Sequence, residues 1–599
     1  MIFFNLIQFV LRTYCVEGVS YYKEYSDRLF ENKPRMFDQK LLTIFSIISV
    51  TLIVSIDGAP KKILIPVATQ LVNIATQGKT PISTPIQKTQ KILSNPAKGT
   101  STGYRKQSTG YHKSSDPLLQ KTILSTLTKP KAPTYKAAVV EVNPVARGDT
   151  IEGVAKVTKQ VVDIIESKDL NGVDIVVLPE GILNTANTAI PLPNSTLYCD
   201  DPNADAVLRK LSCAAQKAKK YVVINLYANE KDEHFSTHLY NMAIVFDRQG
   251  TVIAKYRKYH LFGERGVERP KVPDLTTFTT DFGVTFGVAI CFDLMFANPM
   301  ETLIAHGIKN FVYPTYWFSG LPYLSSAQYQ QSWAYANNVN LLAANTNAPN
   351  IGCSGSGIYS GRSGALEVFV SLTPATKVLI ADVPTNVSAD HSGKMKPIKK
   401  LMANEKLSKS RSISTQDVAN FGREDFSKYS MKFLDFSNNP IQTGEICIDD
   451  FCCEYSIEVS DLGQLKGKSS YSYAISVFHD LRHFKDKNTS KAGQDVCSLI
   501  ACIKNSKENC GIMIPISKVH HRYNFKKIQL ETKLPKTHMK VMPSTLSTDL
   551  QPFQANDFDF KLSEIKEANK YAASLSLNSP KQDLFTFAIF SRDYDRDSA

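Results

Sequence analysis

Three stretches of the chain place a reactive side chain where a run of strand-forming residues ends. They are "VVLPEG" with Glu180, "KYRKYHLFGE" with Lys258 and "FGVAICFD" with Cys291. Charged side chains are rarely found within apolar strands unless they are paired, so Glu180 and Lys258 are informative at these positions. In a layered α/β fold, the ends of neighbouring strands converge on the ligand crevice. We therefore expect the three side chains to meet in one cleft.

A carboxylate, an ammonium and a thiol together are suited to nucleophilic acyl transfer. The carboxylate can take the thiol proton and later deliver it to a leaving amine. The ammonium can lower the pKa of the thiol and stabilise the oxyanion of a tetrahedral intermediate. The competing interpretation is that Cys291 is a core residue, because free cysteine is among the most buried residue types.

The elements expected around these side chains alternate between strands and helices. Strands are predicted at "YKAAVVEV", "VDIVVLPE", "YVVINLY", "GVTFGVAIC", "NFVYPT" and "VNLLAANT". Helices are predicted at 149–168, 204–219, 297–306 and 325–338, with Asp149 as the N-cap of the first. The segments "LYNMAIVFD" and "TVIAKYRKY" flank a turn and predict a hairpin. This alternation predicts an α/β layered sandwich of about 250 residues.

The N-terminal part of the chain has a different composition. Residues 1–59 form an extension whose apolar core, 41–56, is typical of a signal peptide, with the functional signal starting at Met36. The alternative is a retained signal anchor, which would tether the protein to a membrane through 41–56. Residues 60–133, rich in Ser, Thr, Lys and Pro, predict a disordered basic linker.

The net charge of +14 is concentrated in this linker region. Thirteen basic residues and one acidic residue lie between Lys61 and Lys136, so the rest of the chain is close to neutral. This distribution favours a charged tether over a nucleic-acid-binding surface, and we expect no nucleic-acid partner.

The C-terminal part, residues 386–599, is predicted to be a separate β-rich domain. Six of the eleven cysteines fall between 447 and 510, a clustering typical of secreted, disulfide-stapled domains. Their spacing lacks the paired CxxC form of a zinc site, so no metal is expected. Three sequons, at Asn194, Asn386 and Asn488, are compatible with a glycosylated secreted chain.

Two disulfides are favoured by spacing. Cys199 can pair with Cys213 across a short segment, and Cys502 with Cys510 around a small loop. Four more cysteines can pair with one another in three complete connectivities, and the spacing does not choose among them: Cys447, Cys452, Cys453 and Cys497. Cys353 is then left as a free thiol.

Further stretches accompany the three reactive side chains in order along the chain. They are "LSCAAQKAKKYVVINL", "YRKYHLF", "ICFDLMF", "YPTYWFSGLPYLSSAQYQQSWAYANNVNLLAANTN" and "GSGIYS". Together they resemble the nitrilase (carbon–nitrogen hydrolase) superfamily and, more narrowly, its vanin and biotinidase branch. "CIDDFCCEYSI" and "CSLIACIKNSKENCG" look like the cysteine-bearing base domain of that branch. The resemblance implies a nitrilase-type α-β-β-α sandwich at 134–385, followed by a smaller β-rich, disulfide-containing vanin-type domain at 386–599.

The resemblance also implies roles for individual residues. Cys291 would be the nucleophile, Glu180 the general base and acid, and Lys258 the oxyanion-stabilising cation. The backbone N–H of Phe292 would be a second oxyanion donor, and Glu264 would support the site, although a structural ion pair is nearly as plausible for it.

Two aromatic residues and one histidine are further candidates for the site. Tyr316 and Trp317 are candidates for the substrate pocket, with simple packing as an equal alternative. His260 could form a Cys–His dyad with Cys291. Because the family needs no histidine, we expect His260 to have a structural role.

The resemblance implies a secreted amidohydrolase that needs no cofactor and acts on a small-molecule amide through a Cys acyl-enzyme. Pantetheine, giving pantothenate and cysteamine, is expected ahead of biocytin, giving biotin and lysine. The alternative from another class is an inactive vanin-like binding or signalling protein. The presence of Glu180, Lys258 and Cys291 together counts against that alternative.

Overall fold

The structure of the protein is a computed structural model that describes residues 51–56, 59–64, 133–192, 196–387, 421–484 and 490–598. These residues fall into two units, 1–117 and 118–599. In the first unit, strand β1 (Thr51–Ile56) pairs antiparallel with β2 (Ala59–Leu64). The segment expected to be an unstructured linker from residue 60 therefore begins inside a strand. The rest of the expected leader and linker, up to residue 132, lies outside the described residues.

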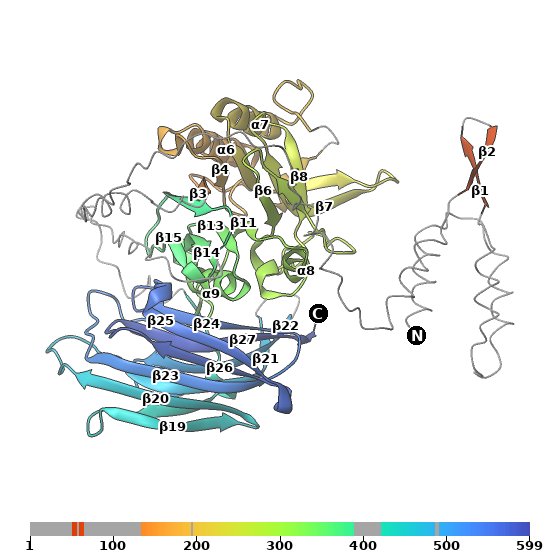
Figure 1. The fold of residues 1–599 in the computed structure, drawn as a ribbon. Coiled ribbons are helices and arrows are strands. Elements are labelled where there is room, and N and C mark those ends of the chain that lie inside the picture. The colour runs from red at the N-terminus through yellow and green to blue at the C-terminus, as the bar shows by residue number, and fades with distance from the viewer. Residues whose placement is uncertain are drawn as a thin grey trace, which may run out of the picture. The chain divides into compact units, whose positions relative to one another are not determined.

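Two sheets form the middle layers of the α/β domain in the second unit (Figure 1). The first sheet has the strand order β16 (Lys377–Pro384), β3 (Thr134–Glu141), β4 (Ile175–Val177), β6 (Tyr221–Lys231), β7 (Thr237–Phe246) and β8 (Val252–Arg257), with β5 (Ile190–Pro191) beside β6. The second has the order β15 (Ala365–Phe369), β14 (Ser356–Ser360), β13 (Asn340–Asn345), β11 (Asn310–Thr315), β10 (Thr285–Val288) and β9 (Thr277–Thr279). The neighbours β3, β4 and β6 run parallel, as do β10, β11 and β13, while β7 and β8 form the expected hairpin.

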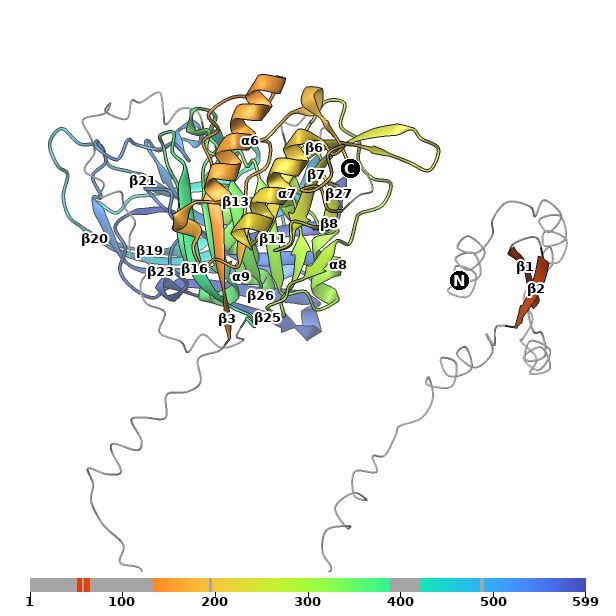
Figure 2. The same cartoon turned by 90° about the horizontal axis from the view of Figure 1, so that it is seen from above.

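Helices α6 (Ile151–Ile165) and α7 (Ala206–Ala218) lie side by side over the first sheet (Figure 2). The apolar stripe of α6 is buried against the sheet because its members recur at helical spacing. The N-cap of α6 is Thr150, not the predicted Asp149: the Thr150 hydroxyl accepts a hydrogen bond from the Gly153 N–H at 3.0 Å. Asp149 instead pairs with Arg147 at 3.1 Å, so the prediction was wrong by one residue.

Helices α8 (Met300–Ala305) and α9 (Ser326–Asn337) lie beyond the second sheet. Nearly every residue of α9 is buried, including its glutamines, because the helix lies between that sheet and the C-terminal domain. The glutamines are accommodated by hydrogen bonds: Gln328 Nε2 donates to Ser544 Oγ at 2.9 Å and Gln331 Nε2 to the Phe553 carbonyl at 2.7 Å. This helix lacks an amphipathic pattern because both of its faces are buried.

The C-terminal domain is a sandwich of two antiparallel sheets over its own apolar core. The sheet nearer α9 has the order β18 (Ser430–Leu434), β21 (Ser472–His483), β22 (Lys491–Cys502), β27 (Leu584–Ser598) and β24 (Met539–Ser547). The other has the order β19 (Ile441–Ile448), β20 (Phe451–Asp461), β23 (Tyr523–Pro535), β26 (Lys570–Leu577) and β25 (Phe558–Ile565). A short parallel pair, β12 (Gly320–Leu321) with β17 (Gly422–Arg423), joins the two domains directly.

Four disulfides cross-link the described residues. They are Cys199–Cys213, Cys447–Cys452, Cys453–Cys497 and Cys502–Cys510. The first and last are the two pairs favoured by spacing. The other two give the connectivity that the sequence left open. Cys447–Cys452 closes the β19–β20 hairpin, and Cys453–Cys497 links β20 to β22 and so joins the two sheets.

Two further sequence features concern the surface. Asn386 is exposed, whereas the sequons at Asn194 and Asn488 lie outside the described residues, as does the polar segment 388–420. Within the part of the chain that the structure describes, no helix combines the length and the apolar character needed to cross a membrane.

The cap of α6 can be tested by substitution. We expect Thr150→Ala to lower the free energy of unfolding by about 1 kcal/mol, because the Gly153 N–H loses its acceptor. Asp149→Ala is the matched control, since Asp149 only makes a surface ion pair, worth about 0–1 kcal/mol. Thermal unfolding followed by circular dichroism measures both, and a larger effect at Asp149 would contradict the assignment.

Candidate active site

Glu180 lies three residues beyond the end of β4 and is tied to the second sheet by its backbone. Its N–H donates to the Thr315 carbonyl at 3.3 Å, and its carbonyl accepts from the Thr346 hydroxyl at 2.6 Å. The end of the first sheet is therefore fixed against the ends of β11 and β13 in the second. The side chain of Glu180 points into the gap between the sheets and is 3% exposed.

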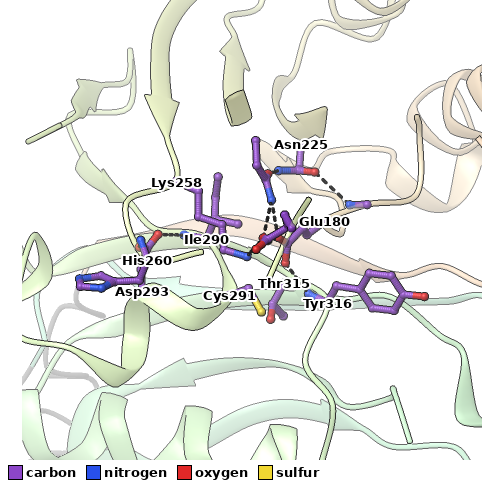
Figure 3. Close-up of polar contacts among 12 residues, drawn as sticks. Glu180, Asn225, Lys258, His260, Ile290, Cys291, Asp293, Thr315 and Tyr316 are labelled. Atoms are coloured by element: carbon purple, nitrogen blue, oxygen red, sulfur yellow. Dashed lines mark hydrogen bonds and ion pairs between the residues drawn. The ribbon is translucent and has the colours of Figure 1, made fainter. Parts of the chain in front are cut away.

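Lys258 directly follows β8, and Glu264 follows six residues later on the same loop. Lys258 Nζ lies 2.7 Å from Glu180 Oε1 and 2.6 Å from Glu264 Oε1, and its side chain is 1% exposed. A buried ammonium is stable only when it is paired and hydrogen-bonded, and here two carboxylates flank it. The structure thus brings together Glu180 and Lys258, the two charged side chains predicted from strand ends (Figure 3). Glu264 joins them through its contact with Lys258.

Two asparagines complete this cluster, and the sequence reasoning missed both. Asn241 of β7 donates through Nδ2 to Glu180 Oε1 at 2.7 Å and to Glu264 Oε1 at 3.3 Å. Asn225 of β6 donates to Asn241 Oδ1 at 2.6 Å and accepts from the Gly181 N–H at 2.9 Å. The available signal was an amide inside each of the apolar runs "YVVINLY" and "LYNMAIVF", where a polar side chain requires a buried partner.

Cys291 was expected at the end of a strand, and it lies on the turn just beyond β10. It opens a short 3₁₀ helix, Cys291–Met295, with a backbone φ of 44°. This left-handed conformation is strained for a residue with a Cβ and must be held by its surroundings. One such contact is the Tyr313 hydroxyl, which donates to the Cys291 carbonyl at 2.6 Å.

Asp293 supplies the other contacts that hold this turn. Its buried carboxylate accepts from the Ile290 N–H at 3.0 Å, from the Tyr256 hydroxyl at 2.8 Å and from the His260 N–H at 2.8 Å. Those donors come from the residue directly before Cys291, from β8 and from the loop that carries Lys258. The aspartate two residues after Cys291 therefore links the thiol-bearing turn to the lysine-bearing loop.

The thiol of Cys291 is buried beside the charged cluster. Burial and the negative charge of Glu180 raise its pKa well above the ordinary value, against the opposing effects of Lys258 and of hydrogen bonds from Thr315 and the Tyr316 backbone. Figure 3 places the sulfur next to Thr315 and near the Glu180 carboxylate. Cys291 is thus a neutral thiol at neutral pH.

The charges of the cluster stabilise one another. Burial alone would lower the pKa of Lys258, but Glu180 and Glu264 outweigh it and raise that pKa well above the ordinary value. Burial opposes ionisation of Glu264, and Lys258 nevertheless holds its pKa below the ordinary value. Lys258 stays protonated and Glu264 stays ionised at neutral pH.

His260 takes no part in this cluster. Burial lowers its pKa to about 4, so the ring is neutral at physiological pH. The ring stacks on Phe296 with centroids 4.0 Å apart, and its Nε2 lies 2.8 Å from the Asn298 carbonyl. These contacts agree with the structural role expected for His260.

A cavity of about 540 Å³ opens above Cys291 and gives the thiol access to a ligand. Phe292, Tyr316 and Trp317 line it, so both aromatic residues suggested from the sequence border the site. Trp317 is also a packing residue: it stacks on Tyr329 at 5.2 Å and its Nε1–H donates to the Leu324 carbonyl at 2.9 Å. The Tyr316 N–H donates to Glu180 Oε2 at 2.8 Å, which fixes the second carboxylate oxygen.

Two other potential ligand sites are not part of the lining of this cavity. Cys353 is the second free thiol among the described residues, and it is fully buried with its backbone bridged to Phe318. The one described group of side chains close enough to hold a metal is Glu445 with Cys447 and Cys452, whose sulfurs are joined in a disulfide.

The C-terminal domain reaches the thiol-bearing turn through Arg592 of β27. This fully buried side chain donates through Nε to the carbonyl of Met295, the last residue of the 3₁₀ helix, at 3.0 Å. Its Nη2 contacts both oxygens of Asp597 at 2.9 Å. The Met295 carbonyl at the C-terminal end of the Cys291–Met295 helix is thus hydrogen-bonded from the other domain.

The buried carboxylate of Asp293 predicts a pH dependence of stability. Burial raises its pKa to about 7, above the unfolded value, so its stabilising contribution is present in acid and is lost as the pH rises through 7. We expect Asp293→Asn to flatten the fall in unfolding free energy between pH 5 and 7, which is about 1.4 kcal/mol per pH unit for one such group. Asp281→Asn, which removes a carboxylate that is 54% exposed, is the control for thermal unfolding at each pH. An unchanged slope in Asp293→Asn would contradict the assignment.

Comparison with known proteins assigns both domains. Residues 136–387 match the carbon-nitrogen hydrolase family and residues 420–597 match the vanin C-terminal domain.

Vanin-like protein 1 of Drosophila melanogaster is 34% identical over 464 residues, which are 73% of this chain and 82% of the relative. A pantetheinase of Mus musculus is 28% identical over 412 residues, 63% of this chain and 76% of the relative. Among solved structures, an amidase from Nesterenkonia sp. is 18% identical with a TM-score of 0.34, covering 43% of this chain and 93% of that chain. The chain belongs to the vanin branch of the carbon–nitrogen hydrolase (nitrilase) superfamily.

Proposed function

We propose that the protein is a secreted amidohydrolase that cleaves a linear carboxamide through an acyl-enzyme on Cys291. The observation that carries the proposal is the buried contact of 2.7 Å between Lys258 and Glu180 next to a thiol that borders a cavity. A carboxylate, an ammonium and a neutral thiol in that arrangement supply a base, an electrostatic stabiliser and a nucleophile.

The first half of the reaction forms the acyl-enzyme. The Cys291 sulfur attacks the amide carbonyl while Glu180 takes the thiol proton. Lys258 and the backbone N–H of Phe292 stabilise the oxyanion that forms. Glu180 then gives the proton to the nitrogen as the C–N bond breaks, and the amine departs.

The second half releases the acid. Water attacks the thioester while Glu180 takes a proton from it, and the C–S bond breaks as that proton returns to the sulfur. When Glu180 is protonated, Lys258 loses one of its two counterions. Glu264, 2.6 Å from Lys258 Nζ, then keeps the ammonium paired, which is a reason for a second carboxylate in the site.

Pantetheine is the proposed substrate, giving pantothenate and cysteamine. The support is the similarity to a pantetheinase over 63% of this chain, together with both matched domains. The four disulfides and the exposed sequon at Asn386 favour an oxidising, extracellular compartment.

The activity is tested with purified protein and two substrates. We expect release of cysteamine from pantetheine, and we expect Cys291→Ala to abolish it because the acyl-enzyme cannot form. Cys353→Ala is the matched control, since it removes the other buried free thiol, which does not border the cavity, and it should retain activity. Release of lysine from biocytin without release of cysteamine would replace the proposed substrate, and activity in Cys291→Ala would overturn the mechanism.

If Glu180 is the base, its substitution should slow turnover but speed alkylation of Cys291. Glu180→Gln removes the base, so turnover should fall by about 10²- to 10⁴-fold. The same change removes the negative charge that helps to raise the pKa of Cys291, so alkylation of that thiol by iodoacetamide at pH 8 should become faster. Glu301→Gln, at a partly buried carboxylate paired with Lys540, is the control for both measurements. Slower alkylation together with lost turnover would indicate a collapsed site instead of a missing base.

A further inference from the structure

The cavity above Cys291 has two walls of different chemistry. Around the thiol the wall is aromatic: Phe262 contacts Phe292 with ring centroids 4.9 Å apart and Phe318 at 6.2 Å. The second wall comes from the C-terminal domain and combines charged side chains with Phe478, Leu481 and Phe484. Its charged members are Arg423, Glu424, Asp425, Lys428 and Arg482.

A buried ion pair lies in this second wall. Arg482 Nε, on β21, is 2.9 Å and 3.3 Å from the two oxygens of Glu424, which follows β17. The two side chains are only 13% and 7% exposed. A buried ion pair gains little stability over apolar packing of the same volume, so its presence in a cavity wall calls for another explanation.

The pair is connected to the thiol by a short series of ring contacts. The Arg482 guanidinium lies 4.7 Å from the ring centroid of Phe484. Phe484 in turn contacts Phe292 edge-on at 4.9 Å, and Phe292 directly follows Cys291. A ligand whose carbonyl lies at Cys291 and whose apolar part lies among these rings would present its far end to Arg482 and Glu424.

The charges of this wall balance, because the three cations Arg423, Lys428 and Arg482 are matched by the carboxylates Glu424, Asp425 and the neighbouring Asp480. Besides the Arg482–Glu424 pair, Lys428 pairs with Asp480 at 2.6 Å. Asp425 accepts from the Ser427 N–H at 3.0 Å, and Arg423 donates to the Glu508 carbonyl at 2.6 Å. Such a wall offers donors and acceptors without excess charge, which suits a neutral group that can both donate and accept hydrogen bonds.

We propose that Glu424 and Arg482 of the C-terminal domain are specificity-determining residues that hydrogen-bond the uncharged, hydroxyl- or amide-bearing end of the substrate. The apolar part next to the scissile amide then lies between Phe262, Phe292 and Phe484. This inference rests on the proposed function and extends it: the α/β domain supplies the chemistry, and the C-terminal domain selects the substrate by its polar end.

Binding is measured apart from catalysis. Cys291→Ala binds without turnover, and pantetheine with a methylated thiol is the probe because a free thiol would exchange with the disulfides. We expect Arg482→Lys and, separately, Glu424→Gln in this background to weaken binding about tenfold by calorimetry, since one charge-assisted hydrogen bond is lost or misaligned. The double change Glu424→Gln with Arg482→Gln leaves no buried charge unpaired, and it keeps the test available if a single variant fails to fold.

The matched control is Arg522→Lys in the same domain. Arg522 also pairs through Nε with a carboxylate, Asp461, at 3.0 Å, and it lies 5.1 Å from the ring of the following aromatic residue, Tyr523. It does not border the cavity, so its substitution should leave binding of the probe unchanged.

Hydrolysis supplies the second measurement. With Cys291 restored, the ratio of kcat/KM for pantetheine to that for propionamide should fall about tenfold in Arg482→Lys, mainly through KM for pantetheine. Propionamide shares the amide but has no polar end. An unchanged ratio overturns the inference.

The outcomes separate the two proposals. Probe binding that is weakened by Arg482→Lys, with no cysteamine released by the intact protein, supports this inference and refutes the proposed activity. If the intact protein releases cysteamine but neither substitution changes binding of the probe, the proposed activity is supported and this inference is refuted. A Cys291→Ala protein that does not bind the probe at all overturns the inference.

Discussion

The site depends on one buried ammonium held between two carboxylates. An unpaired Lys258 could not remain charged where its side chain is 1% exposed, because transfer of an ion out of water costs far more than a fold can offset. Glu180 and Glu264 supply the counter-charge from different directions, one from the end of β4 and one from the loop beyond β8. The contact is therefore also a fold constraint, since it forms only when these two ends of the first sheet converge.

The second sheet is bound to this cluster by the backbone. Glu180 is tied to Thr315 and Thr346, and the thiol-bearing turn is tied through Asp293 to the loop that carries Lys258. The left-handed backbone of Cys291 is maintained between those contacts and the Tyr313 hydroxyl. Strain at a single residue of this kind persists only where the surroundings over-determine it. The position of the Cys291 thiol is thus a consequence of the packing of the two sheets.

Much of this arrangement was readable from local sequence, because its signal is local. A charged or reactive residue directly after an apolar run shows that a strand has ended at a site, and Glu180, Lys258 and Cys291 all carry that signal. Alternating strands and helices likewise predicted the layered domain. The α6 cap was misassigned because adjacent Asp149 and Thr150 are both good caps, and only the backbone geometry chooses between them.

Features that depend on long-range contacts could not be read in the same way. Two of the three buried glutamines of α9, Gln328 and Gln331, have partners in the C-terminal domain more than two hundred residues away, and the helix shows no apolar stripe. The partners of Asp293 and the pairing of Arg482 with Glu424 are similarly set by which loops the two domains bring together. Asn225 and Asn241 were detectable as polar residues in apolar strands, but their partners were not: Asn241 donates to Glu180, and Asn225 donates to Asn241.

Under the proposed function, the two domains have different tasks. Chemistry at Cys291 requires positions fixed to within a fraction of an ångström, and rigid strand ends between two packed sheets provide them. Recognition of a substrate's far end requires only complementary groups at the right distance, and a second domain can supply these from its own strands and loops. Arg592, which closes the end of the 3₁₀ helix that begins with Cys291, shows that this second domain is also part of the support for the nucleophile. Separation of the two domains would therefore remove a wall of the cavity and one support of the thiol-bearing turn in one step, and buried polar contacts such as those of Gln328 and Thr586 hold the two domains together.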